Sequence, residues 1–393
     1  MLSFARYITI LEKPELKGAI AASVIGRLPI GMAGLALMLA TQETTGSFAT
    51  AGAITGAYIA GLAFLAPLLG RSIDRSGPRG VLAACGIAYP AMLCMLIASL
   101  RFGAPVPLAT AIAFVAGACY PPITVCMRAF LRQRLTDDAL LSASYSMESL
   151  LIESIFILGP MLVAVFVATL SAQAAVLFAA GCSFAGTLMF LNSSAIRLWR
   201  IEPRKSSSLF GPLAEPGFPA LLATIVCYAT AFGLVEIGIT GFANEWSRPA
   251  LAGVLLALMS VGSATGALAY GGRTWHAPLR RQFAAMLFLM GAGIAILAGI
   301  HDAWLFAFLS IFAGIVMAPA LIIQSMLVAK LAKPQHATEA FTWSSTGLLA
   351  GVSTGIALGG VILDSAPAST VFAAAGVASM AAAALALLLL RVR

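Results

Sequence analysis

Long apolar stretches, separated by short clusters of charged residues, glycine and proline, repeat along the whole chain. Each stretch reaches the length of about 17 residues or more that a helix needs to cross a bilayer. We therefore expect an all-α membrane protein. The pattern predicts twelve transmembrane helices, at residues 18–40, 49–69, 81–100, 107–128, 140–167, 174–191, 220–241, 249–271, 283–299, 303–328, 339–362 and 369–390.

The composition agrees with this pattern and excludes a soluble enzyme. Of the 393 residues, 61% are hydrophobic and only 10% are charged, whereas about a quarter of a typical soluble domain is charged. The first apolar run is longer than the core of a signal peptide and carries Arg27 at its centre, so we expect a retained first helix. No pattern indicates a metal or a cofactor.

The charges predict the orientation of the helices. Of the 23 lysines and arginines, all except Arg27, Arg101 and Arg248 lie at the termini or in alternate loops. Because cytoplasmic loops carry an excess of lysine and arginine, both termini are expected in the cytoplasm. The formal net charge of +8 therefore has a topological explanation, and we expect no nucleic-acid partner.

A polar segment divides the chain into two halves. Residues 192–218 are rich in arginine, serine and proline and are expected to form a cytoplasmic linker between six-helix bundles at 1–191 and 219–393. Pro122 in helix 4 corresponds to Pro319 in helix 10, at a separation close to half the chain. Two parallel six-helix repeats are one of the transporter architectures built around a midplane site.

A short motif between helices 2 and 3 points to a family. Residues 70–80 resemble the G-x-x-x-D-R-x-G-x-R loop that marks the major facilitator superfamily, whose members are twelve-helix transporters. Asp74 is expected to approach the positive N-terminal end of helix 11, near Arg128, and so to act as a latch of the outward-open state. The matching residues are Gly70, Asp74, Arg75, Gly77 and Arg79.

Helix 5 contains a second feature. Gly159-Pro160 is similar to a helix-5 Gly-Pro motif that, in this superfamily, is associated with exporters of drugs and metabolites. The alternative is a proline kink without directional meaning.

Glycines at helical spacing occur in three of the predicted helices. Small residues on one face allow helices to approach closely in lipid. The resemblance implies that helices 2 and 11, and helices 5 and 8, meet across the two halves, so these glycines are candidates for sliding contacts; static packing is equally compatible. They are Gly52, Gly56, Gly262, Gly266, Gly347, Gly351, Gly355 and Gly359.

Ionisable residues at membrane depth are costly unless they are paired or face water. Arg27 in helix 1 and Glu153 in helix 5 are expected to pair, either as a structural element or as a pair broken and remade during transport. Glu153 is the first candidate proton carrier, and Glu236 in helix 7 is the second. Glu148 lies about 140° around the helix from Glu153 and is expected to pair with Arg128 or the loop between helices 4 and 5.

Three further side chains complete the candidate site. Tyr120, Gln324 and Trp343 lie in helices 4, 10 and 11, and in proteins of the family that the chain resembles, helices 1, 4, 7 and 10 line the central cavity. Each of the three is a candidate for contact with the substrate, and packing is the alternative.

These observations favour a secondary transporter of the cytoplasmic membrane that exports amphipathic drugs or metabolites in exchange for protons. A proton-coupled symporter for a small organic anion is the alternative, motivated by Arg27. A receptor, scaffold or lipid-modifying enzyme is a remote third. The expected partners are a small molecule, protons and membrane lipids, and we expect a monomer.

Overall fold

The computed structural model describes residues 12–135, 138–199, 211–271, 275–333 and 337–389, and within these ranges all regular secondary structure is helical. The N-terminal helices are α2 (Pro14–Thr45), α3 (Phe48–Ser76), α4 (Pro78–Arg101), α5 (Val106–Ala118), α6 (Ile123–Arg134), α7 (Asp138–Thr169), α8 (Ala172–Leu191) and α9 (Ser194–Arg197). The C-terminal helices are η1 (Gly211–Ala214), α10 (Phe218–Glu245), α11 (Leu251–Gly271), α12 (Leu279–Leu297), α13 (Ala303–Gly314), α14 (Met317–Leu331), α15 (Ala337–Leu363) and α16 (Ala368–Leu389).

Most of the expected spans are present. Among the described residues, eleven helical segments are long and apolar enough to cross a membrane, and they include α5 with α6 and α13 with α14 as single spans. The fifth predicted span corresponds to α7, whose apolar part, Ser154–Thr169, is shorter. The protein is therefore an all-helical, multi-pass membrane protein, and the count of twelve spans stays a prediction.

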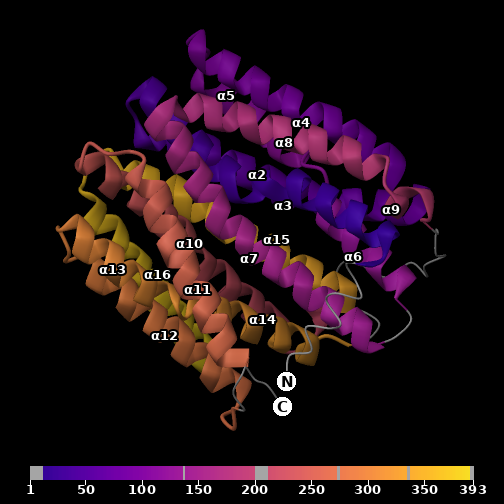
Figure 1. Cartoon of the computed structure of the whole chain (residues 1–393). Helices are drawn as coiled ribbons and strands as arrows, with labels where there is room; N and C mark the ends of the chain where they lie inside the picture. Colours follow the sequence, from indigo (N-terminus) through magenta and orange to yellow (C-terminus); the bar gives the residue numbers. More distant parts are fainter. Residues whose placement is uncertain (1–11, 136–137, 200–210, 272–274, 334–336, 390–393) are drawn as a thin grey trace.

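The helices form two bundles, which Figure 1 shows as an indigo-to-magenta group and an orange-to-yellow group. Helices α2 to α9 pack mainly against one another, and so do α10 to α16. The N-terminal and C-terminal bundles meet where α3 packs against α15 and α7 against α11. In the middle of the linker predicted at 192–218, residues 200–210 lie outside the described residues.

One end of the molecule brings together the loops that follow α2, α4, α7, α10 and α15. Ser47 contacts Asp364, Glu245 contacts Ala368, and Arg101 contacts Gln173. We call this the far end. The opposite end carries the predicted cytoplasmic loops and most of the lysines and arginines, and we call it the basic end.

Spans 4 and 10 are both interrupted near their middle. The first break separates α5 from α6 at Cys119–Pro122, and the second separates α13 from α14 at Ile315–Val316. Pro121 and Pro122 have no N–H for a helical hydrogen bond, whereas Pro319 lies in the first turn of α14, where that N–H is dispensable. The two breaks occupy corresponding places in the two bundles.

The motif at residues 70–80 is mostly helical, which corrects the expectation of a loop there. Helix α3 continues to Ser76, and α4 begins at Pro78; within this stretch the hydroxyls of Ser72 and Ser76 donate to carbonyls one turn earlier. Gly77 alone makes the turn, with φ of 84° and ψ of 166°. This positive φ explains why the motif has glycine at that position.

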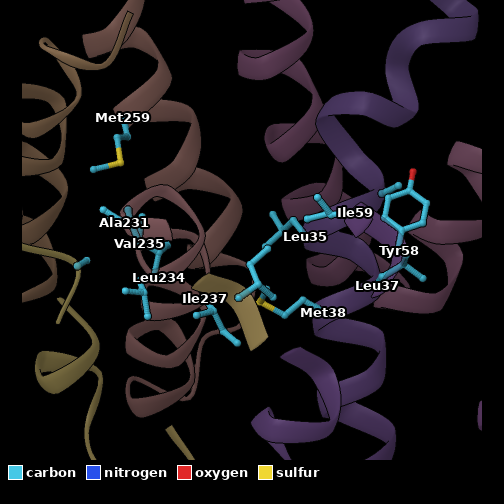
Figure 2. Packing of buried hydrophobic residues seen from close by; sticks show 14 of the residues in the cluster. Leu35, Leu37, Met38, Tyr58, Ile59, Ala231, Leu234, Val235, Ile237 and Met259 are labelled. Atoms are coloured by element: carbon cyan, nitrogen blue, oxygen red, sulfur yellow. The ribbon is translucent and has the colours of Figure 1, made fainter. Parts of the chain in front are cut away.

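A single hydrophobic cluster contains residues of both bundles. Figure 2 shows part of it, with Leu35 and Met38 from α2 and Leu234 and Ile237 from α10. The bundles are thus joined by apolar packing as well as by the polar contacts described below.

Candidate transport site

A buried ion pair lies at membrane depth in the N-terminal bundle. Arg27 of α2 donates from Nη1 to Glu148 Oε2 at 2.8 Å and from Nη2 to Glu148 Oε1 at 3.0 Å. The same guanidinium donates to the hydroxyl of Ser23 at 2.6 Å and to the carbonyl of Ser23 at 3.1 Å. Both charged side chains are 0% exposed. This two-pronged, charge-assisted geometry is the strongest that an arginine makes with a carboxylate.

The pair corrects one expectation, and a contact of Arg27 with Glu153 stays a prediction. Glu148 pairs with Arg27 rather than with the exposed Arg128 or the loop between helices 4 and 5. The reason is the rotation of α7, which presents the stripe containing Glu148, Ile155 and Gly159 to α2. Position 153 lies about 140° around the helix from position 148, and the Glu153 side chain is outside the described residues.

Glycines set the distance between α2 and α7. A Cβ atom added to Gly159 would lie 2.5 Å from the carbonyl carbon of Gly31, and one added to Gly31 would overlap the carbonyl of Ile155. Gly159 therefore permits the close approach that brings Glu148 to Arg27. On the other side of α7, an added Cβ at Gly253 of α11 would overlap the carbonyl of Pro160. The Gly159-Pro160 motif of α7 thus lies between α2 of its own bundle and α11 of the other bundle.

Three tyrosines lie beside this pair. The hydroxyls of Tyr58 and Tyr89 are 2.9 Å apart, and the rings of Tyr89 and Tyr120 pack edge to face. The Tyr120 hydroxyl lies 3.4 Å from the carbonyl of Gly26, next to Arg27 in the chain. The break between α5 and α6 therefore brings Tyr120, as expected for a candidate site residue, to the helix that carries Arg27.

The C-terminal bundle holds a neutral polar chain. The hydroxyl of Tyr228 in α10 donates to Gln324 Oε1 in α14, and Gln324 Nε2 donates to the Ser344 hydroxyl in α15 at 2.6 Å. Gln324 is buried. Trp343, beside Ser344 in the chain, is half-buried and packs against the hydrophobic cluster. Sequence reasoning named Gln324 and Trp343 but missed Tyr228 and Ser344, which have no charge or motif to mark them.

The two bundles repeat one close helix crossing. In the C-terminal bundle, an added Cβ at Gly355 of α15 would lie 3.0 Å from the Cα of Gly233 of α10. We align the two bundles on this contact and on that of Gly159 with Gly31, although the atom nearest to the added Cβ of Gly355 is the carbonyl oxygen of Thr230. Position 344, eleven residues before Gly355, is therefore equivalent to position 148, eleven residues before Gly159.

The equivalent crossings carry different chemistry. Arg27 stands four residues before Gly31, and Ala229 stands four residues before Gly233. The ion pair of the N-terminal bundle therefore corresponds to Ala229 and Ser344, where the C-terminal bundle has an uncharged hydrogen-bond chain instead.

Glu236 lies at the contact between the bundles. Its Oε1 atom is 3.1 Å from the position of a Cβ on Gly34 of α2. Among the described residues, the Glu236 carboxylate has no recorded hydrogen-bond or ion-pair partner. Counting from Gly31 and Gly233, position 34 is the equivalent of position 236, so the two positions meet near the axis that relates the bundles.

Most of the predicted glycine stripe does not lie between the bundles. Gly347, Gly351, Gly355 and Gly359 face α10, and Gly262 and Gly266 face α13, both within the C-terminal bundle. The expectation of sliding contacts is wrong for these six, because a helix has several close neighbours and glycine spacing alone does not identify which one it faces.

Only the pair on α3 meets the opposite bundle. An added Cβ at Gly52 would lie 2.6 Å from the Ile356 carbonyl, and one at Gly56 would lie 3.0 Å from the Ser353 carbonyl.

The structure describes the residues of the predicted latch except for the side chain of Asp74. Gly70 and Arg75 lie in α3, Gly77 makes the turn, and Arg75, Arg79 and Arg128 are exposed. The Asp74 side chain is outside the described residues, so its role stays a prediction.

Comparison with solved structures identifies the fold. The crystal structure of the human organic anion transporter MFSD10 (TETRAN) matches with a TM-score of 0.64 and 18% identity, over 98% of this chain and 100% of that one. The nucleoside transporter NupG matches with a TM-score of 0.70 and 14% identity, over 96% and 100%. The POT family transporter PepTSo matches with a TM-score of 0.73 and 11% identity, over 95% and 97%. The chain thus has the fold of a membrane transporter.

The C-terminal part of the chain also resembles one family in sequence. Residues 220–393 match the family model of the Major Facilitator Superfamily. Among curated proteins, none matches the chain in sequence. The fold of the whole chain and the match of its C-terminal part confirm the resemblance to a major facilitator superfamily transporter.

Proposed function

We propose that the protein is a secondary active transporter of the cytoplasmic membrane that exports small amphipathic drugs or metabolites in exchange for protons. The observation that carries this proposal is the contact between the bundles. Helix α3 packs against α15, α7 against α11 and α2 against α10, and at the far end the side chains of Gln42 and Asn244 are 3.4 Å apart. Two bundles that meet along a few helix pairs are what alternating access by rocking requires.

The charge distribution assigns the two ends to the two sides of the membrane. If the basic end faces the cytoplasm, as the positive-inside rule predicts, the far end faces outward. Polar contacts join the two bundles there. The complete arrangement has twelve spans, with α7 as the fifth.

The ion pair favours an uncharged or amphipathic substrate over an anion. Arg27 is the candidate contact for an organic anion, but its guanidinium already bonds to both oxygens of Glu148 and to Ser23. A buried arginine neutralised in this way presents no net charge to a ligand. The anion symporter is the second candidate because protonation of Glu148 would release Arg27, and because MFSD10, which shares the fold, is an organic anion transporter.

Glu236 is our first choice as proton carrier. Its carboxylate rests against Gly34 of the opposite bundle, so its surroundings change whenever the two bundles separate. A carboxyl group binds protons differently in apolar and in hydrated surroundings. Glu153 of α7 is the second choice, and Arg27 has Glu148 as a partner in this structure.

The test begins with a thermal-shift screen of a drug and metabolite panel to find a ligand. Uptake of that labelled ligand into proteoliposomes is then measured with and without a pH gradient for Glu236→Gln and Glu153→Gln. We expect Glu236→Gln to lose gradient-driven transport and to retain ligand exchange. Glu245→Gln is the matched control, because this glutamate lies on the same helix but caps α16 through Ala368 N at 2.8 Å.

Full proton coupling in Glu236→Gln would refute the assignment of Glu236 as proton carrier. Loss of gradient-driven transport in Glu153→Gln alone would assign that role to Glu153 instead. Gradient-driven accumulation of an organic anion that disappears in Arg27→Lys would favour the symporter.

A further inference from the structure

A carboxylate of one bundle holds the helix terminus of the other at the far end. Asp364 follows the last residue of α15, and its Oδ1 atom accepts hydrogen bonds from the backbone N–H groups of Phe48 at 2.7 Å and Ala49 at 3.2 Å. Its Oδ2 atom accepts from the Ser47 hydroxyl at 2.8 Å. All three donors belong to the start of α3, in the opposite bundle.

This contact completes the N-terminus of α3. The first N–H groups of a helix have no partner within the helix and form its positive end. Ser47 caps α3 by accepting from Thr50 N at 3.1 Å, and the N–H groups of Phe48 and Ala49 are left to Asp364. When the bundles separate at the far end, the hydrogen bonds from these two N–H groups to the Asp364 carboxylate must break.

Close backbone packing brings Asp364 within reach. An added Cβ at Gly360 would overlap the carbonyl of Phe48, and the Ser353 hydroxyl donates to the carbonyl of Gly56 at 2.7 Å. The two helices run antiparallel here, because contacts that move from residue 364 to residue 353 on α15 move from residue 48 to residue 56 on α3.

We propose that Asp364 is the outer gate of the transporter, a latch that stabilises the conformation closed at the far end. This inference rests on alternating access as proposed above. Opening the far end exchanges three hydrogen bonds to a carboxylate for bonds to water, so the latch sets the ratio of closed to open conformations without contacting the substrate.

The same two helices carry a matching arrangement at the basic end. The contact pairs 48/364, 52/356 and 56/353 show that α3 and α15 run antiparallel, so the end of α3, which carries Asp74, and the start of α15 at Ala337 both lie toward the basic end. Asp364 at the end of α15 thus meets the start of α3, and Asp74 at the end of α3 is placed to meet the start of α15. Each acid would serve the conformation closed at its own end.

Distance measurements between the bundles test the latch. Spin labels are attached at Phe102→Cys and His301→Cys, two exposed far-end residues on opposite bundles, after replacement of the six free cysteines. Double electron–electron resonance in lipid nanodiscs then reports the separation at the far end. For Asp364→Asn we expect the ratio of separated to closed molecules to rise about three- to tenfold, as loss of a charged helix cap implies. Asp364→Ala should shift it at least as far.

Asp302→Asn is the matched control. Asp302 is also an exposed acid at the far end and accepts from Leu305 N at 2.8 Å, but it caps α13 within its own bundle. It should leave the distances unchanged. Unchanged distances in Asp364→Asn and Asp364→Ala, or an equal shift in Asp302→Asn, would overturn the proposal. Because the readout needs no substrate, a protein that transports nothing in the panel would refute the proposed function and leave the latch to be judged by the distances.

Discussion

Glu148→Gln should destabilise the protein strongly, because it leaves a buried arginine without its counter-charge. Both side chains are 0% exposed, so water cannot replace the lost partner. The amide introduced by the substitution could still accept one hydrogen bond, and Ser23 would retain its two, but the positive charge of Arg27 would be uncompensated. Breaking a buried pair by removing one partner costs about 3–5 kcal/mol. For a bundle of this size, the apparent Tm should fall by on the order of 10 °C.

The measurement is thermal unfolding of the purified protein in detergent, followed by intrinsic fluorescence. Glu236→Gln is the control, because it removes a carboxylate that has no recorded partner among the described residues, and its Tm should stay close to that of the unsubstituted protein. The double variant Arg27→Met with Glu148→Leu should recover most of the lost stability, since apolar replacement of a whole buried pair is often neutral or stabilising.

Two results would refute this reasoning. A loss below about 1 kcal/mol in Glu148→Gln would mean that water or another group reaches Arg27, contrary to its burial. A double variant as unstable as the sum of the single variants would mean that the two charges do not interact. Transport by a stable double variant would further show that the pair is structural, whereas its loss would assign the pair a role in the cycle.

Two further predictions concern the ends of the molecule. Asp74→Asn should reduce transport severalfold while leaving the folded protein intact, because the latch at the basic end loses its charge; unchanged transport kinetics would reduce the motif to a turn. A reporter active only in the cytoplasm should work when fused after Arg393 and fail when inserted near Glu43 or Asp302, and the reverse pattern would overturn the charge-based orientation.

The spans could be predicted from the sequence because a bilayer demands long apolar segments, which leave a signal at every position. The predicted start of the seventh helix at residue 220 lies close to that of α10 at Phe218, and the proline pair at the break near Pro122 is visible in the sequence as well. The main error lies at residues 70–76, where charged residues indicate a loop but in fact continue α3. Helices often extend beyond the hydrocarbon core, so composition marks the membrane boundary rather than the end of the helix.

The pairing of side chains could not be predicted in the same way. Glu148 and Glu153 lie five residues apart on one helix, and the rotation of α7 against α2 brings Glu148 to Arg27. That rotation follows from the contact of Gly159 with Gly31, a long-range fact that no local pattern contains. Asp364 had no signal at all, because a single acid after a helix is common and its partner lies 316 residues away in the chain.

The position of Glu236 follows from the near-symmetry of the two bundles. Around a two-fold axis, a residue close to the axis contacts its own equivalent, and Glu236 does so by resting on Gly34. A glutamate at both positions would bring two carboxylates together, which disfavours the charged form of each. Glycine at position 34 avoids this repulsion and also provides the space that the Glu236 side chain occupies. These two positions thus hold one carboxyl group where an exact repeat would have two, and its surroundings change when the bundles separate.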